Sequence, residues 1–344
     1  MKLIKPSFNI IEQQSGLEGM YKQIEIAGRT CYKSEDKITE TSAKDFVDRM
    51  IKSGHGAMLE HGTVYLMIHT IAPEDWDKKI ARHHLITIDD SRDYLRTNPT
   101  CNSKGEENWW AKEARHIAHK MVVKYADNQY SKVKIVTTEH EVNTEGGVII
   151  TPTGEMPMVT KGLGKIISVF NTILITTNLR VLVENNWLDD LKYVCEPTEY
   201  HEKRITVRYT SDIHFYKDTT RHRVFSWAIE STRFCNYLKE KFSSSISFLI
   251  PCWIKPEEQE EFEEDLKTIE NIYFKWINKG WQAQQAAYFL IQGTKAEIIM
   301  TGYISDYKHF FDLRSELAIT GKPHPVVMEL VEPLRQEFIK RNLL

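Results

Sequence analysis

Cationic side chains gather between residues 218 and 237. Arg221, His222 and Arg223 stand side by side, and Arg233 follows a short polar run, Glu-Ser-Thr. On an extended backbone the two outer arginines would lie on one side and the histidine on the other. Guanidinium groups hold phosphates and planar oxygen groups bidentately, and hydroxyl and backbone N–H groups complete such sites. This stretch therefore predicts a loop that holds one or two phosphate-rich ligands.

A solvated basic surface patch is the alternative, and for Arg-His-Arg alone it is the favoured one. Four aromatic side chains among the charges favour a binding loop instead: Phe225, Trp227, Phe234 and Tyr237. Solvated loops carry few large aromatic residues. Cys235 lies in the same stretch, where the nearby Arg233 could activate it as a nucleophile. A packing role is the favoured interpretation of that cysteine.

The overall charge argues against bulk binding of nucleic acid. The 344 residues include 45 basic and 48 acidic side chains, which give a net charge of −3. Proteins that bind nucleic acid broadly need a strongly basic surface. A hydrophobic content of 41% and a charged content of 27% are typical of a globular protein. A net charge near zero is still compatible with a local basic pocket.

Membrane and secretion signals are not expected from the sequence. No apolar run approaches the roughly 20 residues that a membrane span needs, and the first residues lack the apolar core of a signal peptide. The five cysteines are odd in number, widely spaced and free of Cys-x-x-Cys. This pattern predicts neither a disulfide framework nor a zinc site, and it favours a reducing cytoplasm.

A second polar group, His55, Glu60 and His61, invites a metal hypothesis. Its spacing does not match the helical His-Glu-x-x-His pattern, and Gly56 weakens a helix there. We therefore expect no metal. Contact with a ligand or capping of a helix is as good an interpretation as plain packing.

The elements that must position these residues follow from hydrophobic periodicity. Helices are predicted over 16–33, from Ser42 to a stop at Gly54, over 75–94, 107–126, 173–190, 256–279, 282–291, the later part of 295–314, and 325–341 with a kink or break before Pro333. Ser42 and Asp45 resemble a capping box at the start of the second helix. Strands are predicted over 63–69, 205–210 and 246–251, with short β-prone runs within 128–164 and loops at 98–105 and 161–165.

The central stretch resembles the signature of the flavin-dependent thymidylate synthases. That signature is Arg-His-Arg, seven residues and then Ser, which here is 221–223 followed by Ser231, with Arg233 and the run 235–237 also matching. Four more blocks resemble the family in the family's order: 27–32, 54–61, 196–204 and 309–314. The stretch 71–170 is not covered and looks like an enlarged insertion.

The resemblance implies an enzyme that methylates dUMP reductively to dTMP. The carbon donor would be methylenetetrahydrofolate, and FAD, recharged by NADPH, would supply the hydride. The implied fold is α+β, with a mixed α/β core in a single domain over 1–344 and the insertion between its early and middle strands. The implied assembly is a homotetramer with shared active sites, working in the cytoplasm.

The resemblance also implies roles for individual residues. The positions that match FAD-binding residues are His55, Glu60, Arg221, His222, Arg223 and His309. Those that match dUMP-binding residues are Asp218, Arg221, Glu230, Ser231, Thr232, Arg233 and Arg314. Arg314 and Ser231 are the expected catalytic residues. A fixed cation such as Arg314 beside the pyrimidine carbonyl would stabilise negative charge on the ring without an enzyme thiolate.

Several positions depart from the family pattern. Ala287 stands where an arginine that helps to hold dUMP is usual, and Ile291 replaces a proline. Tyr303, Ser305 and Ile229 also replace polar or charged residues. A non-catalytic or altered-specificity homologue that binds nucleotide or flavin is therefore the second hypothesis. A nucleic-acid-binding protein is a third, which the acidic balance disfavours.

Overall fold

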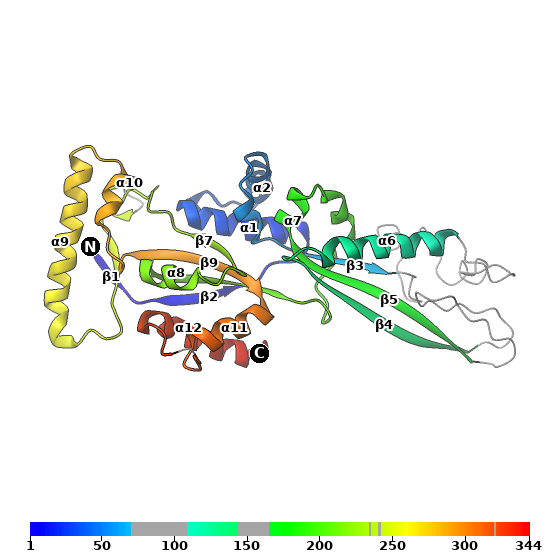
Figure 1. Ribbon diagram of the computed structural model, residues 1–344. Helices are drawn as coiled ribbons and strands as arrows, with labels where there is room; N and C mark the ends of the chain where they lie inside the picture. Colours follow the sequence, from blue (N-terminus) through cyan, green and yellow to red (C-terminus); the bar gives the residue numbers. More distant parts are fainter. Residues whose placement is uncertain (70–108, 144–164, 234, 240–241, 320) are drawn as a thin grey trace. The chain divides into compact units, whose positions relative to one another are not determined.

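The computed structural model describes residues 1–69, 109–143, 165–233, 235–239, 242–319 and 321–344. These form a mixed α/β structure of two compact units (Figure 1). The first unit is Met1–Gly62 with Arg204–Leu344, and the second is Thr63–Lys203. The helix predicted over 75–94 and the loops at 98–105 and 161–164 lie outside the described residues. The second unit contains the stretch 71–170, and its origin as an insertion into a single domain stays a prediction.

A four-stranded antiparallel sheet forms the centre of the first unit. Its order is β2 (Ser7–Ile11), β6 (Arg204–Asp212), β9 (Lys295–Tyr303) and β7 (Ser226–Ile229). β6 includes the predicted strand 205–210, so that prediction is confirmed. β9 is buried along almost its whole length, as expected for an inner strand of a sheet covered on both faces.

Helices cover both faces of this sheet (Figure 1). On one side lie α1 (Gly16–Tyr32), which contacts β7 and β9, and α2 (Ser42–Lys52), which packs on α1. On the other side, α11 (Ile304–Arg314) and α12 (Pro325–Lys340) share an apolar core with β6, β9 and α8 (Ile213–Thr219). The aromatic residues of that core include Phe225, Tyr307, Phe310 and Phe338. The central strands are thus held between two helical layers.

A smaller apolar cluster surrounds α9 (Gln259–Asn278), which confirms the helix predicted over 256–279. β1 (Lys2–Ile4) pairs in parallel with β8 (Ser247–Leu249) beside it. Cys235 is 0% exposed in this cluster, which supports its packing role. The helix predicted over 282–291 is reduced to α10 (Ala283–Ala286) and the 3-10 helix Ala287–Phe289.

One local prediction about a helix end is wrong. The N-cap of α2 is Thr41, and Ser42 is its first helical residue. The Ser42 hydroxyl donates to the Glu25 carboxylate at 2.8 Å, so it joins α2 to α1 and forms no capping box. α12 runs through Pro333, which excludes the interruption predicted there and leaves the alternative, a kink, as a prediction.

The second unit contains a three-stranded antiparallel sheet in the order β3 (Thr63–His69), β5 (Lys165–Asn178) and β4 (Lys132–Asn143). α6 (Trp109–Ala126), which confirms the helix predicted over 107–126, packs on this sheet. The helix predicted over 173–190 is wrong: residues up to Asn178 are strand, and only α7 (Leu179–Glu184) and the 3-10 helix Leu188–Tyr193 follow. Three consecutive β-branched residues, 175–177, and another at 173 favour the strand.

No helix among the described residues is long and apolar enough to cross a membrane.

Gly302 tests how tightly the core is packed behind β9. A Cβ at this position would lie 2.2 Å from Cδ1 of Phe225, which is only 4% exposed and has no room to move. We expect Gly302→Ala to lower the free energy of unfolding by about 1–3 kcal/mol in a urea titration. Gly293→Ala is the matched control, because the nearest atom to its Cβ is Ile291 Cδ1 at 3.9 Å. Equal unfolding midpoints for the two variants would contradict this packing.

Candidate functional site

The Arg-His-Arg segment forms the turn between α8 and β7. The Arg221 side chain is 75% exposed and lies 3.6 Å from the Asp218 carboxylate. Arg223 is also exposed. The turn is fixed from within, because the indole N–H of Trp227 donates to the carbonyl of His222 at 3.3 Å. Two guanidinium groups are therefore presented to solvent on a turn whose backbone is held in place.

Arg314, the last residue of α11, lies against this turn. Its Nε donates to Nε2 of His222 at 3.1 Å. Its Nη1 lies 3.3 Å from the Asp218 carboxylate, and its Nη2 donates to the Asp218 carbonyl at 3.4 Å. Asp218 and Arg314 are 96 residues apart in the chain, so the fold brings together three residues that the family resemblance selected separately.

His222 is neutral in this arrangement. Burial, and then the charges of Arg314 and His309, lower the pKa of His222 to about 4. The His309 ring lies 6.4 Å away between centroids, and the Phe310 ring lies 5.0 Å away. Since Nε2 accepts from Arg314, the proton of the neutral ring is on Nδ1. His222 thus orients the guanidinium group of Arg314 without adding charge.

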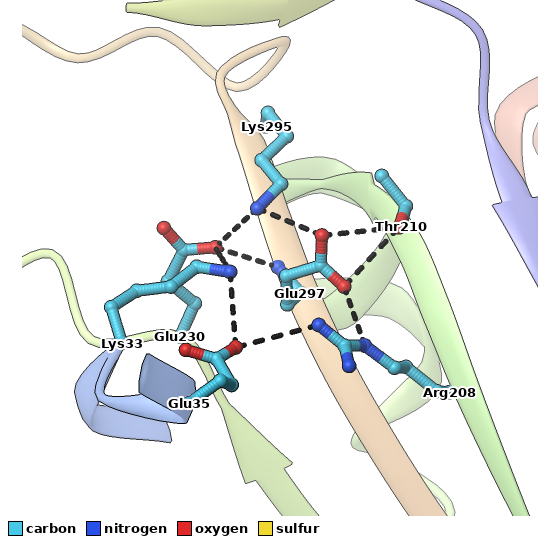
Figure 2. A network of polar contacts seen from close by, with 7 residues as sticks. All are labelled: Lys33, Glu35, Arg208, Thr210, Glu230, Lys295 and Glu297. Atoms are coloured by element: carbon cyan, nitrogen blue, oxygen red, sulfur yellow. Dashed lines mark hydrogen bonds and ion pairs between the residues drawn. The ribbon is translucent and has the colours of Figure 1, made fainter. Parts of the chain in front are cut away.

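Glu230 belongs to a second polar cluster (Figure 2). The residue is only 4% exposed. Its Oε2 accepts from Nζ of Lys295 at 2.8 Å and from the backbone N–H of Glu297 at 3.0 Å. Nζ of Lys33 lies 3.6 Å from the same oxygen. Lys33 follows α1 in the left-handed conformation, with φ 49°, which is uncommon outside glycine.

The cluster continues along the strands beside it. Glu297 contacts Lys295 at 2.9 Å, Arg208 at 3.0 Å and the Thr210 hydroxyl at 3.1 Å. Glu35 lies 3.5 Å from Lys33 and 3.4 Å from Arg208. Burial alone would raise the pKa of Glu297, but Lys295, Lys33 and Arg208 outweigh it and bring the pKa to about 2. Figure 2 shows three carboxylate side chains interleaved with three basic ones, so each acidic group of the cluster has a basic neighbour.

This charged cluster, Lys33, Glu35, Arg208, Glu230, Lys295 and Glu297, anchors the polar run that follows β7. The Glu230 N–H donates to the Glu297 carbonyl at 2.8 Å, and the Ser231 N–H donates to the Cys31 carbonyl at 3.0 Å. Thr232 is half-buried, and exposed Arg233 donates to the Gln284 amide oxygen at 3.4 Å. The Glu230 carboxylate bonds within the protein, and a direct contact from it to a ligand stays a prediction.

The His55 group begins beside the last residue of α1. Nε2 of His55 lies 3.0 Å from the Tyr32 hydroxyl, and its Nδ1 is buried without a hydrogen-bond partner among the described residues. Although His55 is the N-cap of α3 (Gly56–Leu59), its side chain makes no capping bond. The carbonyl of Glu60 accepts from Arg204 at 2.9 Å.

His61 is structural. It is fully buried, its Nδ1 lies 2.8 Å from the Thr301 hydroxyl, and burial lowers its pKa to about 3. Within the part of the chain that the structure describes, no three His, Cys, Asp or Glu side chains are placed to hold a metal ion.

The residues that sequence reasoning missed are the partners of Glu230. Lys33, Arg208, Lys295 and Glu297 were not among the predicted site residues. Lys295 and Glu297 are two apart on β9, so they lie on one face of that strand. Two charges at this spacing at the start of an apolar run are the signal that could have found them.

Comparison with known proteins supports the resemblance that the motifs indicated. Residues 196–322 match the sequence model of a family described as thymidylate synthase complementing protein. The flavin-dependent thymidylate synthase of Pyrococcus furiosus is 31% identical over 124 residues, which are 36% of this chain and 48% of that protein. The enzyme of the same name from Pyrococcus abyssi is 27% identical over 126 residues, 36% of this chain and 49% of that protein. The resemblance to the flavin-dependent thymidylate synthases is confirmed.

The chain spans about half the length of the curated flavin-dependent thymidylate synthases that it matches. The family match contains the Arg-His-Arg turn, Glu230 and Arg314, whereas His55 and Glu60 lie outside it. A UMP/dUMP methylase, PolB from Streptomyces cacaoi, solved with 5-Br dUMP, aligns with 16% identity and a TM-score of 0.34 over 40% of this chain and 66% of that chain. The same protein solved with 5-Br UMP aligns with 16% identity and a TM-score of 0.33, over 40% of this chain and 69% of that chain. Scores this low carry no argument about fold or function.

The low pKa of His222 predicts part of the acid sensitivity of the fold. An unfolded histidine has a pKa of about 6.5, so the stabilisation from neutral His222 is complete above that pH. It is lost as the pH falls towards 4, because the unfolded chain then binds the extra proton. We expect His222→Gln to lose less unfolding free energy than the unchanged protein between pH 7 and pH 5.

The measurement is urea unfolding at both pH values. His119→Gln, at an exposed position of α6, is the control and should keep the original pH dependence. An unchanged dependence in His222→Gln would show that His222 is not held neutral by folding.

Proposed function

We propose that the chain is a flavin-dependent thymidylate synthase. It would convert dUMP to dTMP with methylenetetrahydrofolate as carbon donor and with FAD and NADPH as the source of hydride. The observation that carries the proposal is the family match over 196–322, because it includes the cationic turn and the arginine that packs against it. The α+β fold of that family, its homotetramer with shared active sites and a cytoplasmic location belong to the same proposal.

The residues present fit a flavin dinucleotide. Arg221 and Arg223 present guanidinium groups on a fixed turn, and guanidinium groups pair well with a pyrophosphate. Nδ1 of His55 is a buried nitrogen without a partner among the described residues, so it has a hydrogen bond to offer. Glu60, His222 and His309 complete the proposed flavin-binding set. Bound and reduced FAD would supply hydride to the carbon unit.

For dUMP, the proposed phosphate ligands follow Glu230 directly. Ser231, Thr232 and Arg233 offer two hydroxyl groups and a guanidinium group on a run whose start is anchored by the charged cluster. Asp218 and Arg221 complete the proposed set. Arg233 is exposed and contacts α10 through Gln284, so a phosphate can approach it from solvent.

Arg314 is the proposed catalytic cation. Asp218 and His222 fix its guanidinium group from two sides. A cation held beside the pyrimidine carbonyl lowers the free energy of the negative charge that develops on the ring. Cys235 is 0% exposed, which fits an enzyme that activates the ring without a thiolate. Ser231 would position dUMP beside this cation.

A second candidate is a homologue that binds nucleotide or flavin without turnover. Ala287, where the family has an arginine, lies in the 3-10 helix next to α10, the helix that Arg233 contacts. Tyr303 is only 6% exposed, and the Arg204 guanidinium lies 5.6 Å from its ring centroid. That tyrosine therefore serves packing. The missing cation at Ala287 is the observation that favours this candidate.

Release of tritium from C5-labelled dUMP separates the two candidates. The protein is first saturated with FAD, whose binding is followed by the flavin absorption bands. Release that depends on both NADPH and methylenetetrahydrofolate supports the synthase. Flavin binding with complete retention of the label supports the non-catalytic homologue, and failure to bind FAD at all contradicts both.

Arg314→Ala should greatly reduce turnover and leave the protein folded. Loss of a preorganised cation that stabilises the transition state costs about 10²–10³ in kcat. Arg314→Lys keeps the positive charge but loses the planar guanidinium group that reaches both Asp218 and His222. Its kcat should therefore lie between that of Arg314→Ala and that of the unchanged protein. Tritium release and a thermal melt are measured on the same samples. Undiminished release in Arg314→Ala would remove Arg314 from the mechanism.

A further inference from the structure

A cavity of about 330 Å³ lies in the first unit, lined by residues that the proposed synthase site does not use. Ends of β6 and β8 contribute to it, together with α9, α12 and the loop before β9. Its apolar wall is made of Pro6, Leu249, Ile250, Pro251, Trp253, Phe262, Leu266, Ile291 and Val326. Ligand pockets start at about this volume, which suits a molecule of one or two rings.

The remaining lining residues give the cavity an acidic and aromatic character. Asp212 and Glu329 bring two carboxylates, and His214 and His324 bring two imidazole rings. Among the residues that the structure describes, no lysine or arginine lines the cavity, although the charge of nearby Lys5 acts on Glu329. The imidazole rings stack with centroids 3.8 Å apart and an interplanar angle of 32°. Phosphate and carboxylate ligands are therefore disfavoured, which separates this cavity from the cationic turn.

The polar side chains of the cavity make hydrogen bonds within the protein, and their carboxylates can accept further hydrogen bonds from a ligand. Asp212 accepts the Phe215 N–H at 2.8 Å as the N-cap of α8. Nδ1 of His324 accepts the Val326 N–H at 3.4 Å. The Glu329 carboxylate hydrogen-bonds the Cys252 thiol, and burial raises its pKa. A carboxylate accepts several hydrogen bonds, so Glu329 can still accept one from a charged donor.

Trp253 supplies an aromatic face beside these groups. It is 54% exposed, and its ring centroid lies 5.7 Å from that of His324 in an edge arrangement. Indole faces attract organic cations, and carboxylates nearby strengthen that preference.

We propose that this cavity binds a small aromatic amine, a flat apolar ring that carries a cationic nitrogen. The ring would occupy the apolar part between Trp253 and Phe262. The ammonium group would bind Glu329 and the Asp212 carboxylate. The proposal concerns a separate site and holds whether or not the chain is a thymidylate synthase.

Calorimetric titration with two matched probes tests the proposal on the full chain. Phenethylamine and 3-phenylpropionate share a ring and a two-carbon spacer and differ in the sign of their charge. We expect phenethylamine to bind and 3-phenylpropionate to give no heat above dilution at millimolar concentration. No binding of phenethylamine, or equal binding of both probes, would overturn the proposal.

Variants locate the binding. Glu329→Gln keeps the shape and removes the charge, and it should weaken phenethylamine binding by about tenfold. Glu264→Gln, at an exposed position of α9, should leave it unchanged.

Trp253→Ala is a second test in case Glu329→Gln does not fold. The Trp253 side chain is largely exposed, so its removal should leave the protein folded. It should weaken binding by about three- to fivefold, and Trp281→Ala, outside the cavity, should not. Unchanged affinity in both Glu329→Gln and Trp253→Ala would place the amine elsewhere and overturn the proposal.

Discussion

A buried carboxylate sets the geometry of the candidate site. Glu230 leaves β7 with 4% exposure, and a buried charge is costly unless cations and N–H donors surround it. These partners come from two elements: β9 provides Lys295 and the Glu297 N–H, and the end of α1 provides Lys33. The polar run that follows therefore has a fixed starting point. Its position depends on three segments that are far apart in the sequence and that meet only when the sheet is complete.

The second organising contact is the pair of bonds that Arg314 makes with Asp218 and His222. A guanidinium group on the last turn of a helix has many rotamers in isolation. Here a carboxylate and a neutral imidazole select one of them, which is the kind of preorganisation that electrostatic catalysis requires. The Arg-His-Arg turn precedes β7 and the polar run 230–233 follows it, so this short strand connects the two segments of the proposed site.

Local pattern was sufficient for some elements and insufficient for others. The alternation of β6 and the amphipathic face of α9 identified them, because each element has one face on a core. β9 is buried on both faces and reads as a plain apolar run, which has no period to detect. The helix expected over 173–190 failed because the β-branched residues before Asn178 prefer a strand, and its pairing with two distant strands was not visible locally. The partners of Glu230 were missed for the same reason: only the register of β9 beside β7 and β6 brings Lys295 to it.

We propose that the charged cluster holds the run 231–233, the proposed dUMP phosphate ligands, in the conformation that binds. A double-mutant cycle with Glu230→Gln, Lys295→Met and the combined variant measures it, with both dUMP affinity and unfolding free energy as readouts. Removing Lys295 alone should lower the unfolding free energy by about 3–5 kcal/mol, because it leaves Glu230 without its nearest cation. The account predicts a coupling energy of about 1–3 kcal/mol in both readouts. If the two substitutions have additive effects on dUMP affinity and are coupled only in unfolding free energy, the cluster stabilises the fold without shaping the binding run. That result would contradict the proposal.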